Sequence, residues 1–168
     1  MRRAVFLLDV DGCLLSRRGW DGPPRVATVQ LRGVPHELTF VPERLAAIRR
    51  LELEVRWCTS WSGDQDILED SLGLPPFPDA LAGSGVDVTD RNSVAEAKLR
   101  AAIAVVEIER RPLAWADDEA IPTSGPELQK LEAAHSLLLR VPHAEGLRRE
   151  HFEQIDDWLA TVDHHPSL

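Results

Sequence analysis

Carboxylate and hydroxyl side chains follow three apolar segments of this 168-residue chain, at the point where each segment ends. They are Asp9 and Asp11, Thr59 and Ser60, and Asp117 and Asp118. If the segments are neighbouring parallel strands, their carboxyl ends meet at one edge of the sheet, where the binding sites of such sheets form. Carboxylates gathered there repel one another unless a cation lies among them. Mg²⁺ is the expected cofactor, because it takes oxygen ligands from a few carboxylates and leaves positions for phosphate oxygens and water.

The elements that would position these groups alternate between short apolar runs and amphipathic stretches, the pattern of β-α units around a parallel sheet. The expected strands are residues 4–8, 54–58, 112–116 and 136–141, and the expected helices are residues 42–51, 63–72, 92–110, 126–134 and 147–160. Residues 4–8 are apolar throughout, which is typical of a central strand buried on both faces. Asn92 or Ser93 is expected to cap the long third helix. The pattern predicts an α/β fold, a three-layer sandwich in one domain that spans residues 1–168.

Two connecting segments have a different pattern. Residues 16–41 contain an alternation of apolar and polar residues around Gly33, which predicts a β-hairpin flap over one end of the sheet. Residues 77–90 are rich in turn formers, and a short edge strand is expected near residues 80–82. Neither segment is long enough to form an inserted cap domain.

Composition excludes several classes of protein. With 43% hydrophobic and 28% charged residues, the chain is typical of globular domains rather than of disordered ones. Its formal net charge of −9 argues against an extended nucleic-acid surface, because phosphate binding depends on Lys and Arg. The apolar run at residues 4–8 is too short for a membrane span or a signal peptide, so we expect no membrane partner and a cytoplasmic location. Cys13 and Cys58 are expected to be reduced thiols.

Four motifs of the chain resemble those of the haloacid dehalogenase (HAD) superfamily in order and spacing. They are FLLDVDG (residues 6–12), WCTS (57–60), Lys98 and WADDE (115–119). Over about residues 4–158, the organisation is most similar to that of the small capless members, including the HAD-like domain of multidomain RNA-repair proteins. The resemblance implies a HAD-type Rossmann-like sheet and an Mg²⁺-dependent phosphatase that hydrolyses phosphomonoesters through an aspartyl phosphate. The phosphorylated substrate would be a nucleic-acid end, a phosphoprotein or a small metabolite.

The resemblance implies a role for each acidic residue. Asp9 would be the nucleophile, which attacks phosphorus and so divides hydrolysis into two easier steps. Asp11 would protonate the leaving oxygen and then activate water. Gly12 would keep side chains clear of the phosphate. Asp117 and Asp118 would bind the Mg²⁺ ion. Its other ligands would be Asp9 and the main-chain carbonyl of Asp11.

The same resemblance implies the groups that bind phosphate. Thr59 would donate its hydroxyl to a phosphoryl oxygen, and Ser60 competes for this role because both residues end the strand. Lys98 would neutralise charge on the phosphoryl group and on the aspartyl phosphate. Lys98 precedes Arg110 by 12 residues, about 18 Å along a helix, and the strand that ends at Asp117 spans roughly 17 Å. We therefore expect Lys98 to lie level with Asp117.

Other interpretations of these residues stay open. Asp9 and Asp11 are also turn formers at the end of a strand, and Asp117 or Asp118 can cap a following helix. A lysine in the middle of a helix, as Lys98 is, is usually a solvated surface residue. The alternatives to hydrolysis are a binding or regulatory module that keeps the HAD scaffold without turnover, and a phosphotransferase.

Overall fold

The four apolar segments pair as parallel strands of one sheet in the computed structural model of the protein, which describes residues 3–164. They are β1 (Val5–Leu8), β4 (Glu54–Trp57), β5 (Leu113–Asp117) and β6 (Leu137–Arg140), in the order β4-β1-β5-β6. Val5 lies opposite both Glu54 and Leu113, so β1 is an inner strand, and all its side chains are buried. The predicted α/β class with a parallel sheet is confirmed. Residues 1–2 and 165–168 of the predicted domain lie outside the described residues.

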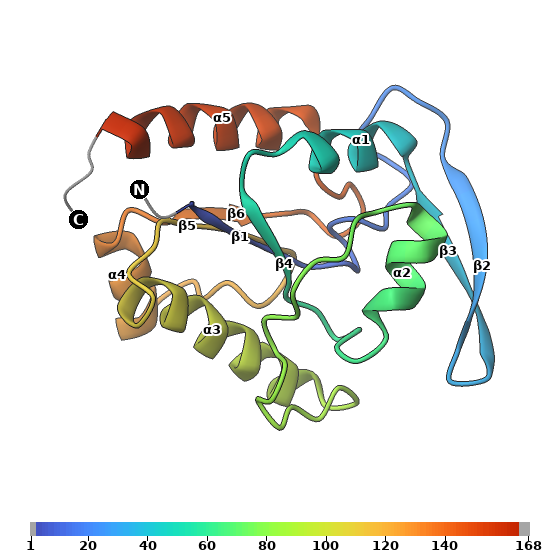
Figure 1. The fold of residues 1–168 in the computed structure, drawn as a ribbon, viewed down its shortest axis with the longest axis horizontal. Coiled ribbons are helices and arrows are strands. Elements are labelled where there is room, and N and C mark those ends of the chain that lie inside the picture. Colours follow the sequence, from blue (N-terminus) through green and yellow to red (C-terminus); the bar gives the residue numbers. More distant parts are fainter. Residues whose placement is uncertain (1–2, 165–168) are drawn as a thin grey trace.

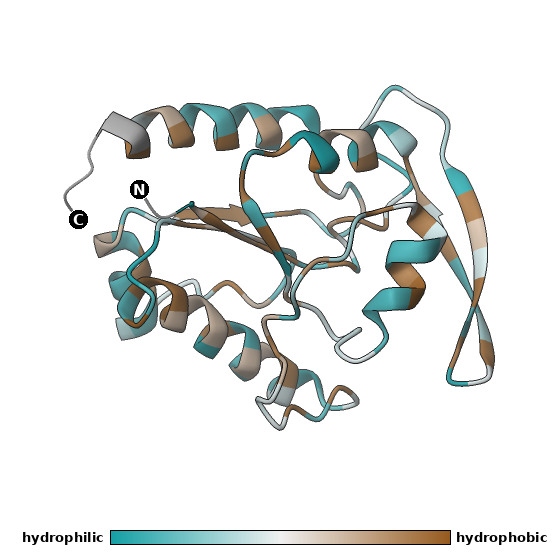
Figure 2. Ribbon diagram, viewed as in Figure 1, coloured by the Kyte–Doolittle hydropathy of each residue, from teal (hydrophilic) through white to brown (hydrophobic). Residues whose placement is uncertain are grey.

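Helices cover both faces of the sheet and give three layers (Figure 1). They are α1 (Pro42–Arg50), α2 (Gln65–Leu72), α3 (Arg91–Glu107), α4 (Pro126–Ala133) and α5 (Arg149–His164). Phe6 and Leu8 pack in one core cluster with residues of α1 and α5, whereas Val5 and Leu7 pack in a second with α3 and α4. Figure 2 shows the apolar stripe of α5 turned toward the sheet. Within residues 3–164, no helix has both the length and the apolar character needed to cross a membrane.

The path of the chain creates a switch point beside β1. From β1 the chain passes through α1 to β4 on one side of β1, and from β4 it passes through α3 to β5 on the other side. Because α1 and α3 lie on opposite faces of the sheet, the direction of winding reverses between β1 and β5 (Figure 1). Ligands of open α/β sheets bind outside the carboxyl ends of the strands at such a point. Asp9 and Asp117 lie there.

The predicted hairpin is present, and its bounds are narrower than the predicted flap. Its strands are β2 (Arg25–Leu31) and β3 (Val34–Phe40), which pair antiparallel. Arg32 and Gly33 connect them with φ of 51° and 77°, and two positive φ angles are typical of the tight type I′ hairpin turn. Val29 and Leu38 are buried in the core cluster of α1 and α5. The hairpin stands beside α2, beyond the end of the sheet toward which the strands run (Figure 1).

Two local predictions were wrong. The cap of α3 is Asp90, whose carboxylate accepts hydrogen bonds from the backbone N–H groups of Asn92 and Ser93. The helix therefore begins at Arg91, before the predicted cap Asn92, because the Asp90 carboxylate already accepts from these backbone N–H groups. The edge strand expected near residues 80–82 is reduced to one isolated bridge between Trp57 and Asp79. Elsewhere the predicted and observed ends of the elements coincide or differ by at most four residues.

A buried arginine joins the loops that flank the carboxyl ends of the strands. Arg44 of α1 is fully buried, and its guanidinium donates hydrogen bonds of 2.5–3.2 Å to five backbone carbonyls. They belong to Leu14, Ser16, Arg18, Glu145 and Leu147. Burial lowers the pKa of Arg44 to about 10, so the side chain keeps its charge and all its donors at neutral pH. One side chain thus holds the loop after β1 against the loop that precedes α5.

We predict that Arg44→Met lowers the free energy of unfolding by at least about 3 kcal/mol, since several buried carbonyls lose their partner. Arg50→Met is the matched control, because Arg50 is exposed at the end of the same helix. Its effect should stay within about 0.5 kcal/mol. Urea denaturation measures both variants. An equal loss of unfolding free energy in both variants would show that the hydrogen bonds of Arg44 to the carbonyls do not stabilise the fold.

Candidate functional site

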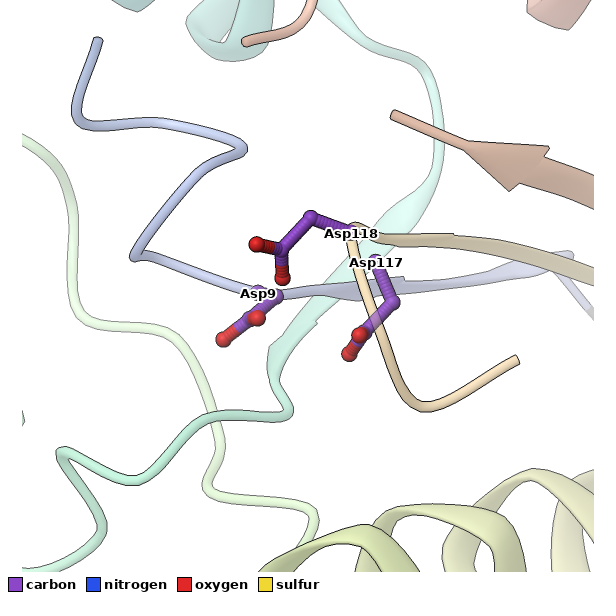
Figure 3. Close-up of side chains that lie close together, drawn as sticks. All are labelled: Asp9, Asp117 and Asp118. Carbon is purple, nitrogen blue, oxygen red and sulfur yellow. The ribbon is translucent and has the colours of Figure 1, made fainter. Parts of the chain in front are cut away.

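Three carboxylates converge at the switch point. Asp9 follows β1 directly, Asp117 is the last residue of β5, and Asp118 comes next (Figure 3). One carboxylate oxygen from each lies within 4.8 Å of the other two. Asp9 and Asp117 are buried, with 4% and 0% of their surface exposed, and Asp118 is half-buried. Three hard oxygen donors at this spacing, next to open solvent through Asp118, fit a small divalent cation such as Mg²⁺.

A buried ammonium group bridges two of these carboxylates. The Nζ atom of Lys98 lies 2.8 Å from an oxygen of Asp9 and 2.8 Å from an oxygen of Asp117. Lys98 is 6% exposed, so the interpretation of this lysine as a solvated surface residue is wrong. The comparison of helix and strand lengths placed it level with Asp117, and the structure confirms that position. Burial alone would lower the pKa of Lys98, but the two carboxylates outweigh burial and raise it, so the ammonium stays charged.

The electrostatics of Asp9 are set by opposing effects. Burial raises the pKa of its carboxyl group, the Lys98 ammonium lowers it, and the charge of Asp117 raises it, and together these effects bring it to about 7. One Asp9 oxygen accepts a hydrogen bond from the backbone N–H of Val10 at 2.8 Å, and the other faces Lys98. A divalent cation at the cluster would favour the ionised form of Asp9, because an opposite charge at close range lowers a carboxyl pKa.

The two carboxylate oxygens of Asp117 have different partners. Its Oδ1 atom accepts hydrogen bonds from the backbone N–H groups of Glu119 and Ala120, at 2.9 and 2.6 Å. Its Oδ2 atom accepts one from Lys98. The first pair of contacts forms a local turn rather than a helix cap, since α4 begins only at Pro126. The turn fixes the carboxylate so that its other oxygen points toward the site.

A histidine that the sequence analysis did not select lies against the cluster. The Nδ1 atom of His143 is 2.5 Å from Oδ2 of Asp118, and 76% of the His143 side chain is exposed. His143 follows β6, the fourth parallel strand, so the rule that located the other groups at strand ends also applies to it. The sequence around His143 shows no spacing to Asp118 that marks a ligand pair, because the two residues follow different strands.

Gly12 leaves room for the contact between Asp118 and His143. Its φ is +71°, a conformation that side-chain-bearing residues rarely adopt. A Cβ at this position would also lie within 2.4 Å of the Asp118 carboxylate and 2.6 Å of the His143 ring. The predicted role for Gly12 was clearance for a phosphate. The clearance in the structure is for the Asp118–His143 contact.

Asp11 does not join the carboxylate cluster through its side chain. It is exposed, and its Oδ2 atom accepts a hydrogen bond of 3.0 Å from the indole Nε1–H of Trp61. The side chain of Asp11 therefore lies outside the group of three carboxylates. The resemblance implies coordination by its main-chain carbonyl, and that stays a prediction. Trp61 was missed because a tryptophan gives no ligand or nucleophile signal in a sequence.

The two hydroxyl residues after β4 differ in burial. Thr59 is fully buried, and Ser60 is half-buried. The Oγ1 atom of Thr59 accepts a weak hydrogen bond of 3.4 Å from the backbone N–H of Trp61. Because a hydroxyl both accepts and donates, Thr59 keeps its own hydrogen for another acceptor. The choice between Thr59 and Ser60 as the phosphate-binding hydroxyl stays a prediction.

Cys13 and Cys58 are free and buried, as predicted. Burial raises the pKa of both thiols well above its usual value, and the nearby carboxylates act in the same direction. Both are therefore protonated at neutral pH and behave as small apolar side chains, since the thiolate is the reactive form.

No model of a protein family, no curated protein and no solved structure matches this chain. The chemistry that the site can perform follows from the charges, distances and burial of its own residues.

We predict that Lys98→Met lowers the free energy of unfolding of the metal-free protein by about 3–5 kcal/mol at pH 7, because Asp9 and Asp117 lose their buried counter-charge. Lys130→Met is the control. Lys130 forms an exposed ion pair with Glu107 at 3.0 Å, which contributes at most about 1 kcal/mol. Urea denaturation compares the variants, and a loss no larger for Lys98 than for Lys130 would contradict the proposed importance of the buried pair.

Proposed function

We propose that this protein is an Mg²⁺-dependent phosphomonoester hydrolase that acts through an aspartyl phosphate on Asp9, as the resemblance to the HAD superfamily implies. The observation that carries the proposal is the group of three converging carboxylates with the ammonium of Lys98 at 2.8 Å from two of them. Carboxylates supply both a nucleophile and oxygen ligands, and the ammonium supplies a fixed positive charge for an anionic substrate.

The cation would be held by the carboxylates of Asp9, Asp117 and Asp118, and by the main-chain carbonyl of Asp11. When bound, Mg²⁺ supplies positive charge that polarises a phosphoryl oxygen and offsets the charge that develops there. The anchored turn of Asp117 and the contact of Asp118 with His143 support this assignment, because ligand orientation is usually fixed by such neighbours.

The reaction has two displacements at phosphorus. In the first, a carboxylate oxygen of Asp9 forms a bond to phosphorus while the bond to the leaving oxygen breaks. Asp11 gives a proton to that oxygen, which departs as an alcohol. In the second, water gives a proton to Asp11 and attacks phosphorus, so that phosphate leaves and the Asp9 carboxylate is restored. The exposure of Asp11 suits contact with both the alcohol and the water.

Lys98 and Thr59 would stabilise negative charge at the site without forming or breaking covalent bonds. The Lys98 ammonium favours the ionised form of Asp9, which is the form that attacks. It also offsets negative charge on the phosphoryl group. Thr59 would donate its hydroxyl hydrogen to a phosphoryl oxygen. Because the formal net charge of the chain is −9, a terminal phosphate or a small phosphorylated metabolite fits better than a substrate that needs a long basic surface.

We predict that the protein hydrolyses p-nitrophenyl phosphate, that EDTA abolishes the activity and that Mg²⁺ restores it. Asp9→Asn should lower kcat by more than about 10³-fold, because the variant lacks the attacking carboxylate. Asp156→Asn is the control, since Asp156 is exposed on α5. Release of nitrophenol measures turnover, and thermal melting shows that each variant is folded. Normal activity in Asp9→Asn, or activity that EDTA does not affect, would overturn the proposal. Mg²⁺ binding without turnover by the wild type would favour the binding module.

A second prediction concerns His143, which contacts Asp118 through Nδ1. His143→Ala should weaken Mg²⁺ binding by about 10-fold or more, because partners that orient a metal ligand typically have effects of this size. His143→Asn should retain most of the affinity, since the asparagine amide N–H takes the position of the Nδ1–H group. The Mg²⁺-dependent rise in melting temperature gives the dissociation constant without any assay of turnover. Equal affinities in all three proteins would leave His143 without a role at the cluster.

A further inference from the structure

We propose that Trp61 is a positioning residue for Asp11, and that its indole N–H sets which carboxyl oxygen of Asp11 exchanges protons with the leaving group. The inference rests on the proposed function and deepens it. It concerns the placement of the Asp11 side chain, which is not among the three carboxylates of the cluster. The juxtaposition that carries it is the hydrogen bond from Nε1 of Trp61 to Oδ2 of Asp11, 3.0 Å long, between residues 50 positions apart in the chain.

Asp11 and Trp61 differ in how tightly the surrounding structure holds their side chains. Asp11 is exposed, and within residues 3–164 its carboxylate accepts one hydrogen bond, from the indole of Trp61. Trp61 is 8% exposed and packs in the core cluster that also contains residues of β1 and α1. Without the indole N–H, a carboxylate on the surface would sample several rotamers. With it, a rigid and largely buried ring selects the rotamer of an exposed group.

Trp61 is itself held by several contacts. Its backbone N–H donates to Thr59 at 3.4 Å, and its carbonyl accepts from the N–H of Asp64 at 2.8 Å. The ring of His36, on β3 of the hairpin, contacts it edge-on with centroids 6.4 Å apart. The Arg32–Asp64 ion pair of 2.7 Å joins the hairpin to the same loop. The geometry of Asp11 therefore depends on the loop after β4 and on the hairpin.

The chemistry of the indole explains why a tryptophan suits this position. An indole N–H donates one hydrogen bond and accepts none. While it occupies Oδ2, the proton that Asp11 gives or takes is carried on Oδ1. The indole N–H itself does not titrate, so the donor is present at every step of the reaction. Asp11 thus offers one oxygen in one direction to the leaving group, and correct placement of a reacting group has a large effect on rate.

The test compares two esters that differ in the leaving group. An activated aryl phosphate needs little protonation as it departs, whereas a primary alkyl phosphate needs a great deal. We expect Trp61→Phe to lower kcat with the alkyl phosphate by about 10–100-fold and to change kcat with p-nitrophenyl phosphate by less than about threefold. If Trp61→Phe is poorly folded, Trp61→Leu takes its place. It also lacks the N–H donor, so it should show the same difference between the two esters.

Trp158→Phe is the matched control. Its indole also donates a hydrogen bond, of 2.9 Å, to the carbonyl of His135, so the variant loses a comparable contact away from the carboxylate cluster. Both substrates should then be hydrolysed at wild-type rates. Asp11→Asn should lose about 10²–10⁴-fold with the alkyl phosphate, and addition of Trp61→Phe should cause no further loss, because the indole acts through Asp11.

Two outcomes would overturn the inference alone. Equal losses with both esters would show that Trp61 supports the fold of the site, and a further loss in the double variant would show that it does not act through Asp11. A wild-type protein that hydrolyses neither ester would overturn the proposed function and this inference together. The wild-type rate with p-nitrophenyl phosphate therefore separates the two kinds of failure.

Discussion

The interaction on which the site depends is the contact of the Lys98 ammonium with the carboxylates of Asp9 and Asp117, 2.8 Å from each. Two buried carboxylates side by side are unfavourable, since each loses hydration and repels the other. A buried ammonium offsets both costs only if it lies between them. The contact also joins α3 to the ends of β1 and β5, so one buried charge links three elements.

The fold makes this contact possible through the direction of its strands. The winding reverses between β1 and β5, so no connection crosses between the carboxyl ends of these two strands. Arg44 then fixes the neighbouring loops, by hydrogen bonds to carbonyls of the loop after β1 and of the loop before α5. Gly12 allows the first loop to pass close to Asp118. The hydrogen bonds of Arg44 and the close approach at Gly12 thus both fix the loop that follows β1.

Two carboxylates only two residues apart have been given different surroundings. Asp9 is buried beside an ammonium, and Asp11 is exposed beside an indole N–H. Different environments are how proteins assign different roles to chemically identical groups. In the proposed reaction the buried member attacks phosphorus and the exposed member moves protons. The hairpin contributes to this division, because His36 packs against the ring of Trp61.

The sequence by itself determined the parallel sheet, the hairpin, the strand-end position of the acidic residues and the level of Lys98 along its helix. These features follow from periodicity and from fixed lengths per residue, which are local properties of the chain. Only the tertiary structure decided that Lys98 is buried, that Asp11 turns to Trp61 and that His143 reaches Asp118. Each of these features depends on residues that are far apart in the chain. The direction of a polar side chain at a strand end is set by the partner that the fold brings to it, and no local pattern in a sequence encodes that partner.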